Sequence, residues 1–196
     1  MHLSSAARHT LLLVVFLLCL PASATTMLRI DLPELSRTAD AVVHGTVRRV
    51  ESRWSGDGRR ILTDVEIQVT ESLKGEPGST VLVTQPGGRV GDIGQRVSGL
   101  ASFTPGEEVV VFLEKRGPQA FRVSGQAQGK YRVQRSADGS RALAVPESTE
   151  EVLLLDPSTR QATSSSRRTL SLEELRAAIH AALDQPAGTG TEEKSR

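Results

Sequence analysis

The sequence predicts a mainly β protein: a small OB-like β-barrel, closed or nearly closed, followed by one C-terminal α-helix. Short valine-rich runs recur along the chain, and some alternate apolar with polar residues as half-buried strands do. Clusters of Gly, Pro and Asp separate these runs, which is typical of turns. One late segment instead repeats its apolar residues at helical spacing. A β-sandwich is the alternative, because the pairing order of strands cannot be read from one sequence.

The first 24 residues have the three-part layout of a secretory signal peptide. A basic start at Arg8 precedes an apolar run over residues 11–20, which is too short to span a bilayer, and Pro21 ends the run. Small residues up to Ala24 match a signal-peptidase site, so we expect cleavage between Ala24 and Thr25. The sequence therefore predicts an exported protein, periplasmic or secreted, with no transmembrane span after cleavage.

The composition left after that cleavage argues against several classes of site and partner. Cys19, the single cysteine, lies in the apolar run, so the mature chain would lack disulfides, thiolate metal sites and a cysteine nucleophile. A lipoprotein is the alternative, although Leu18 stands where lipidation needs a small residue. Loss of Arg8 leaves equal numbers of basic and acidic residues, which argues against nucleic acid and anionic lipid as partners.

The first part of the mature chain predicts a leader and then a hairpin. Residues 25–37 form a short leader, and residues 38–146 form the barrel domain. Valine-rich residues 41–50 and the cleanly alternating residues 61–69 are expected to pair, because a Ser-Gly-Asp-Gly turn lies between them. Gly45, inside the first of these runs, predicts a bulge or a sharp bend.

Further strands are expected over residues 81–85, 108–114, 121–123, 130–135 and 141–145. The run at 108–114 is almost continuously apolar, which indicates burial on both faces. Asp138-Gly139 is a hairpin signal between the last two strands. Glycine-rich residues 87–94 are interpreted as an inter-strand connection. They are also a candidate ligand loop, because glycine lets the backbone approach a ligand closely.

The C-terminal part divides into a linker over residues 147–170, an amphipathic helix over residues 171–184 and a disordered tail over residues 185–196. Ser171 and Glu174 have the spacing of a capping box. We expect the helix to dock on the barrel, with a groove of a partner protein as the alternative. Its apolar stripe comprises Leu172, Leu175, Ile179 and Leu183.

Several short motifs follow one another along the chain. They are residues 39–47 (ADAVVHGTV), Thr63, residues 71–75 (ESLKG), 85–88 (QPGG), 103–108 (FTPGEE) and 111–113 (VFL). Through them the stretch from Thr38 to Arg135 resembles a group of exported bacterial proteins without an assigned function. Their overall pattern is similar to the netrin/TIMP-like form of the OB-fold, which implies an OB-like barrel. TIMP-like inhibitors present an N-terminal cysteine to a protease zinc. The N-terminus expected here is Thr25, so no functional residue is carried over.

No pattern in the chain forms a recognisable catalytic, cofactor or metal site. His44 and His180 are isolated, and two histidines without a cysteine do not suggest a zinc site. A hydrolase that uses His44 with a serine and a carboxylate is one alternative, although the chain lacks a Gly-x-Ser-x-Gly elbow. Asp64 and Glu66 share the polar face of one strand, where a solvated surface is the simpler interpretation of the pair.

The sequence therefore favours a non-enzymatic binding module whose partner is a protein or an envelope component, without a cofactor. The candidate contacts lie in or beside turn residues: Trp54, Arg59, Arg89 and Asp92. An envelope hydrolase with an atypical site and a structural subunit of a surface assembly are the alternatives.

Overall fold

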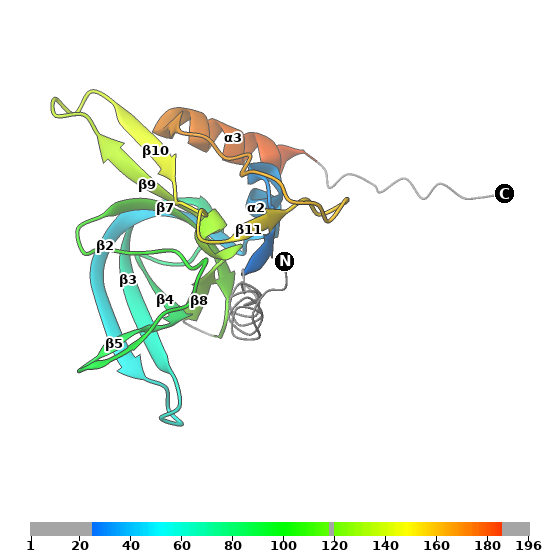
Figure 1. Cartoon of the computed structure of the whole chain (residues 1–196). Coiled ribbons are helices and arrows are strands. Elements are labelled where there is room, and N and C mark those ends of the chain that lie inside the picture. Colours follow the sequence, from blue (N-terminus) through cyan, green and yellow to red (C-terminus); the bar gives the residue numbers. More distant parts are fainter. Residues whose placement is uncertain (1–24, 118–119, 186–196) are drawn as a thin grey trace, which may run out of the picture.

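The computed structural model describes residues 25–117 and 120–185, and its fold is mainly β (Figure 1). The helical elements are α2 (Leu32–Thr38), the short 3-10 helix η1 (Gln126–Gly129) and α3 (Leu172–Asp184). The strands are β1 (Thr26–Leu28), β2 (Ala41–Trp54), β3 (Ile61–Lys74), β4 (Thr80–Pro86), β5 (Gly88–Val90), β6 (Ile93–Gln95), β7 (Glu108–Lys115), β8 (Ala120–Val123), β9 (Lys130–Arg135), β10 (Ala142–Pro146), β11 (Leu153–Leu155) and β12 (Leu170–Ser171). The predicted signal peptide, with Cys19 and Ala24, and nearly all of the predicted tail lie outside the described residues.

Five strands close into a ring in the order β7, β2, β3, β4 and β8, and β8 pairs again with β7. The pairs are antiparallel except β4–β8, which is parallel. This ring confirms the small barrel over the sandwich. The β2–β3 ladder shifts register between His44 and Gly45, as the sequence predicted. A Cβ on Gly45 would lie 2.3 Å from the carbonyl oxygen of Gln68, so only glycine fits there.

Strand β7 belongs to two cores, which explains its almost continuous apolar sequence. Val109, Val111 and Leu113 point into the barrel core, because side chains alternate along a strand. Val110 and Phe112 point outward into a second core. The sheet continues from β7 through β9 and β10 to β12, and these strands form one side of that outer core. The predicted burial of both faces is confirmed.

Helix α3 covers the outer core and packs against α2 (Figure 1). Ser171 and Glu174 form the predicted capping box, since each side chain bonds to the backbone N–H of the other residue. Leu172, Leu175 and Ile179 are buried, and Leu183 is partly buried against the same core. The predicted stripe and the predicted docking of the helix on the barrel are both confirmed.

The segment predicted as a leader contains β1 and the seven-residue helix α2. Asp31 caps this helix, because its Oδ1 accepts a hydrogen bond from the N–H of Glu34 at 2.8 Å. Pro33 lies in the first turn, where the missing N–H costs no hydrogen bond. Leu35 anchors the helix in the outer core. Seven residues hold too few apolar positions for a helical period to stand out in a sequence.

The segment predicted as a linker also forms two strands. β11 pairs in parallel with β1, and β12 pairs with β10. The guanidinium of Arg167 then ties the segment to the barrel domain, because it donates to the carbonyl oxygens of Gln128 and Glu147, each at 3.0 Å. These contacts hold the loop between β10 and β11 beside the barrel.

Candidate functional site

The glycine-rich stretch forms a small antiparallel hairpin, β5–β6, that lies against the far end of β2 and β3. A Cβ on Gly88 would lie 2.2 Å from Ser52 Oγ and 2.3 Å from Thr63 Oγ1. Thr63 Oγ1 donates to the carbonyl of Gly87 at 2.7 Å, and the N–H of Gly87 donates to the carbonyl of Ile61 at 2.8 Å. The predicted inter-strand connection is therefore fixed at one end of the barrel.

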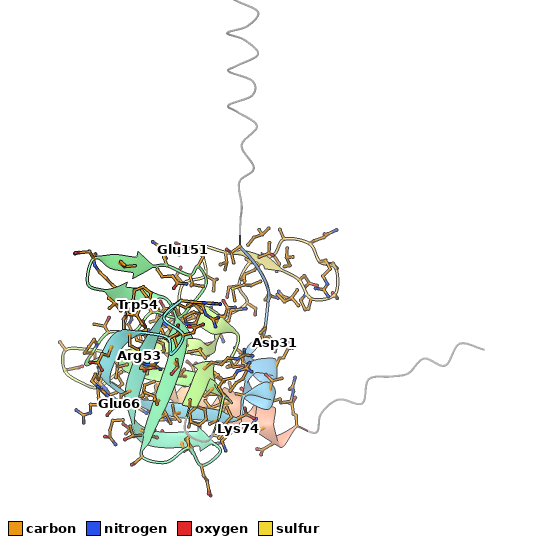
Figure 2. All side chains as sticks on the ribbon, turned by 90° about the horizontal axis from the view of Figure 1, so that it is seen from below. Asp31, Arg53, Trp54, Glu66, Lys74 and Glu151 are labelled. Atoms are coloured by element: carbon orange, nitrogen blue, oxygen red, sulfur yellow. The ribbon has the colours of Figure 1, made fainter. Side chains whose placement is uncertain are left out.

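The four predicted contact residues lie on the β2–β3 hairpin and on the β5–β6 hairpin. Trp54 ends β2 and is 40 % exposed, and Arg59 lies in the turn that leads to β3. Arg89 is on β5, and Asp92 is in the turn between β5 and β6. The two arginines and the aspartate are exposed. Figure 2 shows Trp54 beside the β5–β6 hairpin. The structure therefore brings this hairpin and the turn between β2 and β3 to the same end of the barrel.

Two exposed aliphatic residues at this end had no signal in the sequence. Ile93 is 57 % exposed on β6, and Val97 is 37 % exposed just after it. Single aliphatic residues in a glycine-rich stretch form no periodic pattern, so their exposure is visible only in the structure. Together with Trp54 they add apolar surface to the predicted contact region.

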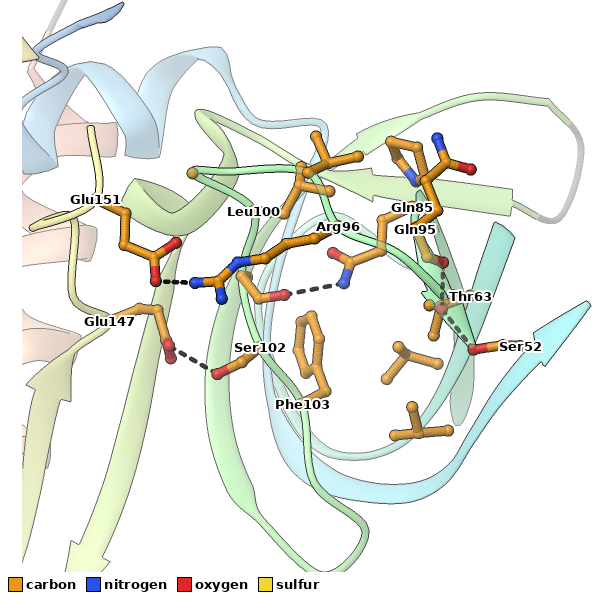
Figure 3. A pocket seen from close by; sticks show the side chains of 18 of the residues that line it. Ser52, Thr63, Gln85, Gln95, Arg96, Leu100, Ser102, Phe103, Glu147 and Glu151 are labelled. Carbon is orange, nitrogen blue, oxygen red and sulfur yellow. Dashed lines mark hydrogen bonds and ion pairs between the residues drawn. The ribbon is translucent and has the colours of Figure 1, made fainter. Parts of the chain in front are cut away.

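A cleft of about 630 Å³ opens next to the β5–β6 hairpin (Figure 3). Its volume lies within the range of ligand-binding clefts. One wall is formed by residues 95–103, the other by residues 147–151, and the floor by residues of β2 and β3. The two walls are called the amide wall and the acidic wall below. The side chains that line the cleft include Val50, Val65, Arg96, Phe103, Glu147, Glu150 and Glu151.

Two side-chain amides fasten the amide wall to the barrel. Gln95 Oε1 accepts a hydrogen bond from the N–H of Ile61 at 3.0 Å. Gln85 Nε2 donates to the carbonyl oxygen of Ala101 at 2.9 Å. Both bonds join the wall to β3 or β4, so this side of the cleft has a defined position.

The acidic wall is fastened from behind by a buried lysine. Lys130 is fully buried, and its Nζ donates to Glu147 at 3.0 Å, to Glu107 at 2.8 Å and to the carbonyl of Ser102. A buried ammonium needs such partners, because desolvation without them would be strongly unfavourable. Burial favours a high pKa for Glu147, but a hydrogen bond from Ser102 at 2.7 Å and the charge of Lys130 outweigh burial and lower this pKa.

One ion pair crosses the mouth of the cleft. Arg96 extends from the amide wall to the carboxylate of Glu151 on the acidic wall (Figure 3). Both side chains are largely exposed, at 77 % and 56 %. Glu150, the neighbouring carboxylate, is exposed, and no ion pair between described residues involves it.

His44, the residue on which the hydrolase alternative depends, is 3 % exposed and is not among the residues that line the cleft. Its Nε2 lies 2.7 Å from Glu108, and Arg176 donates to its Nδ1 at 3.4 Å and pairs with Glu71 at 2.7 Å. Hydrogen bonds from Arg135 and His44 hold the pKa of Glu108 below its usual range, against the effect of burial. Within residues 25–117 and 120–185 no hydroxyl bonds to His44, so the geometry offers it no serine nucleophile. The cluster joins α3 to the barrel.

The other singled-out polar residues form surface contacts. Arg53 donates to Asp64 at 2.5 Å, and Arg49 pairs with Glu66 at 3.4 Å. Asp64 and Glu66 are therefore occupied by surface ion pairs, which agrees with the solvated surface expected for the pair. His180 is exposed on α3.

In the part of the chain that the structure describes, no group of three or more His, Cys, Asp or Glu residues is arranged to hold a metal ion. The described helices include none with the length and apolar character needed to cross a membrane. The chain matches no protein-family model. A comparison with curated proteins also finds no significant match.

Proposed function

We propose that this chain is an exported, non-enzymatic binding module that recognises another protein of the cell envelope. The contact surface would be the end of the barrel that carries the β5–β6 hairpin and the cleft. Export is proposed from the signal-like pattern of residues 1–24. The OB-like character is proposed from the motif pattern and from the ring of five strands, the strand number of OB barrels, which bind ligands with one barrel face and its loops.

One observation carries the proposal: exposed apolar and charged side chains gather on two hairpins beside a cleft, at a single end of the barrel. Trp54, Ile93 and Val97 supply apolar area, and tryptophan is among the residue types enriched where binding energy concentrates. Arg89 and Asp92 supply charges on the same hairpin. Hydrogen bonds fix the supporting loops, so little conformational freedom would be lost on binding.

The experiment expresses the chain with its N-terminal segment in a Gram-negative host and crosslinks it in the envelope. Captured proteins are then identified by mass spectrometry. We expect a reproducible partner whose capture falls at least about tenfold in Trp54→Ala and in Arg89→Ala, because truncating a hot-spot residue costs about 2 kcal/mol or more of binding free energy.

Two matched variants control for general surface effects. Leu143→Ala removes a side chain that is 42 % exposed on β10, and Arg141→Ala removes an exposed arginine on the β9–β10 turn. Both should capture the partner as the unmodified chain does. Capture that is insensitive to Trp54→Ala and Arg89→Ala would show that the surface is elsewhere. Capture of only the chain itself would favour a structural subunit, and no capture would contradict the binding module.

A further inference from the structure

We propose that the cleft binds an arginine side chain on an extended segment of the partner protein, and that the acidic wall, residues 147–151, receives its guanidinium. This inference rests on the proposed function, since it names the chemistry of the partner at the same end of the barrel. Three properties of the cleft carry it: the balance of charge, the guanidinium that the chain itself places there, and the fixed position of the acidic wall.

Carboxylates outnumber cations in the cleft. Glu147, Glu150 and Glu151 stand on the acidic wall, whereas Arg96 is the one cation among the described residues that line the cleft. Lys130 neutralises Glu147 from behind, but Glu150 has no such partner in the described part of the chain. An incoming cation therefore meets one carboxylate, Glu150, that no ion pair between described residues occupies, beside Glu151, which is paired only with the exposed Arg96.

The pair of Arg96 with Glu151 indicates which kind of cation fits. A guanidinium presents planar N–H donors that match the two oxygens of a carboxylate, whereas an ammonium acts as a point charge. Because both partners are largely exposed, solvent and salt screen the pair and its contribution to stability is small. An arginine of the partner can therefore bind Glu150 or displace Arg96 from Glu151. Arg96 then acts as an internal competitor.

The acidic wall is held in place at both ends. At its start, the N–H of Glu147 donates to the carbonyl of Lys130 at 3.0 Å, and Arg167 donates to the carbonyl of Glu147 at 3.0 Å. At its end, the N–H of Val152 closes a turn by donating to the carbonyl of Thr149 at 3.1 Å, and the buried side chain of Val152 anchors this turn. A wall fixed in this way presents its carboxylates without a large ordering cost.

The floor of the cleft suits the aliphatic part of an arginine. Val50 and Val65 form the floor, and the ring of Phe103, the last residue of the amide wall, adds apolar surface next to Ser102 (Figure 3). Long cationic side chains bury their methylene stem on apolar surface and keep the charged head in a polar environment. The volume of about 630 Å³ admits the side chain together with some of its flanking backbone.

The test titrates the ¹⁵N-labelled, secreted chain with two synthetic peptides at low salt. One is Gly-Ser-Gly-Arg-Gly-Ser-Gly, and the other carries citrulline in place of arginine, which keeps the shape and removes the charge. We expect the arginine peptide to bind at least about fivefold more tightly, since hydrogen bonds to charged groups exceed neutral ones by that order. The largest amide shifts should fall on the acidic wall, residues 147–151.

Three variants test how the charged groups of the cleft change the affinity for the arginine peptide. Arg96→Gln should tighten binding of the arginine peptide about threefold, because it removes the competitor and its positive charge. The double variant Glu150→Gln with Glu151→Gln should weaken binding about fivefold or more, toward the citrulline value. Glu173→Gln, which removes an exposed carboxylate on α3, is the matched control and should leave the affinity unchanged.

Equal affinity for the two peptides, no binding of the arginine peptide, or weaker binding by Arg96→Gln would overturn the arginine assignment. The result is separable from the test of the proposed function. If Trp54→Ala abolishes capture of the partner while citrulline binds as well as arginine, the binding module stands and the arginine assignment fails. If the peptides behave as expected while capture is insensitive to Trp54→Ala and Arg89→Ala, the cleft stands and the proposed contact surface fails.

Discussion

At the scale of single residues, the motif positions have structural explanations. Gly45 and Gly75 lie where a Cβ would be 2.3 Å from the carbonyl of Gln68 and 2.7 Å from that of Asp40. Lys74 Nζ donates to the carbonyl oxygens of Ser36, Arg37 and Ala39, so it satisfies the C-terminal end of α2. Burial lowers the pKa of Lys74, against the charge of Asp40. These motif residues thus serve packing and capping more than they form a ligand site.

Gly88 is the residue whose replacement should disturb the candidate site most directly. Its φ is +123°, and a Cβ would collide with the hydroxyls of Ser52 and Thr63. We expect Gly88→Ala to lower the free energy of unfolding by on the order of 2 kcal/mol, because it adds backbone strain to a steric clash. Urea unfolding would measure the loss, and faster amide exchange in β5 and β6 would locate it.

Gly94→Ala is the matched control for this substitution. Gly94 lies on the paired strand β6, its φ is outside the left-handed region, and nothing lies within 4 Å of an added Cβ. Its free energy of unfolding should stay close to that of the unmodified chain. Equal losses in the two variants would mean that the contact of Gly88 with β2 and β3 does not hold the hairpin.

At the scale of elements, α3 was visible in the sequence and α2 was not. The helix period of α3 extends over thirteen residues with a capping box, so local signals agree with its tertiary position. Helix α2 has seven residues, and its stability comes from Leu35 in the outer core and from the cap supplied by Lys74 of β3. The tertiary contacts that hold it are thus distant in sequence. Asp31 and Pro33 are local signals for a helix start, but seven residues are too few for the apolar period that would complete them.

We expect Leu175→Ala to reduce the free energy of unfolding by about 2 to 5 kcal/mol, because it leaves a cavity in the outer core. Leu175 of α3 is fully buried in the outer core, where it lies with Ile179 and with residues of β7. Chemical denaturation followed by circular dichroism would measure the change. His180→Ala, on the exposed side of the same helix, should change little. A Leu175→Ala variant as stable as the unmodified chain would contradict the docking of α3 on the barrel.

At the scale of the whole molecule, two ionic clusters join parts of the chain that are far apart in sequence. One joins Lys130 to Glu107 and Glu147, and the other joins His44 and Arg135 to Glu108. In each cluster a carboxylate has a lowered pKa. Removing one member of a buried or half-buried ion pair strongly destabilises the folded state, because the other charge is left buried without its partner.

These carboxylates predict a loss of stability in acid. Glu147 has a folded pKa below its ordinary value of 4.5, mainly because the Ser102 hydrogen bond and Lys130 outweigh burial. A depressed folded pKa contributes stability that is complete above the ordinary value and is lost as pH falls through the folded pKa. The free energy of unfolding should therefore be level from about pH 7 to about pH 5 and decline below about pH 4.5.

Urea titrations across this range would check the prediction, with two variants for comparison. Glu147→Gln should be less stable at neutral pH, since Lys130 loses a partner, and its decline in acid should be shallower. Glu150→Gln removes an exposed carboxylate of the same wall and should keep the slope of the unmodified chain. Identical slopes in the two variants would show that the Lys130 cluster does not determine the acid sensitivity.

The sequence by itself determined the main strands, the β2–β3 and β9–β10 hairpins, the bulge at Gly45 and the helix α3 with its cap. These features follow from side-chain period, turn residues and capping, which act over a few neighbouring residues. The tertiary structure alone decided the ring closure through β7 and β8, the helix α2, and the cleft between residues 95–103 and 147–151. Each of these depends on contacts between segments far apart in the chain. The pairing of Arg96 with Glu151 is of this kind, because the two residues are 55 positions apart in the sequence.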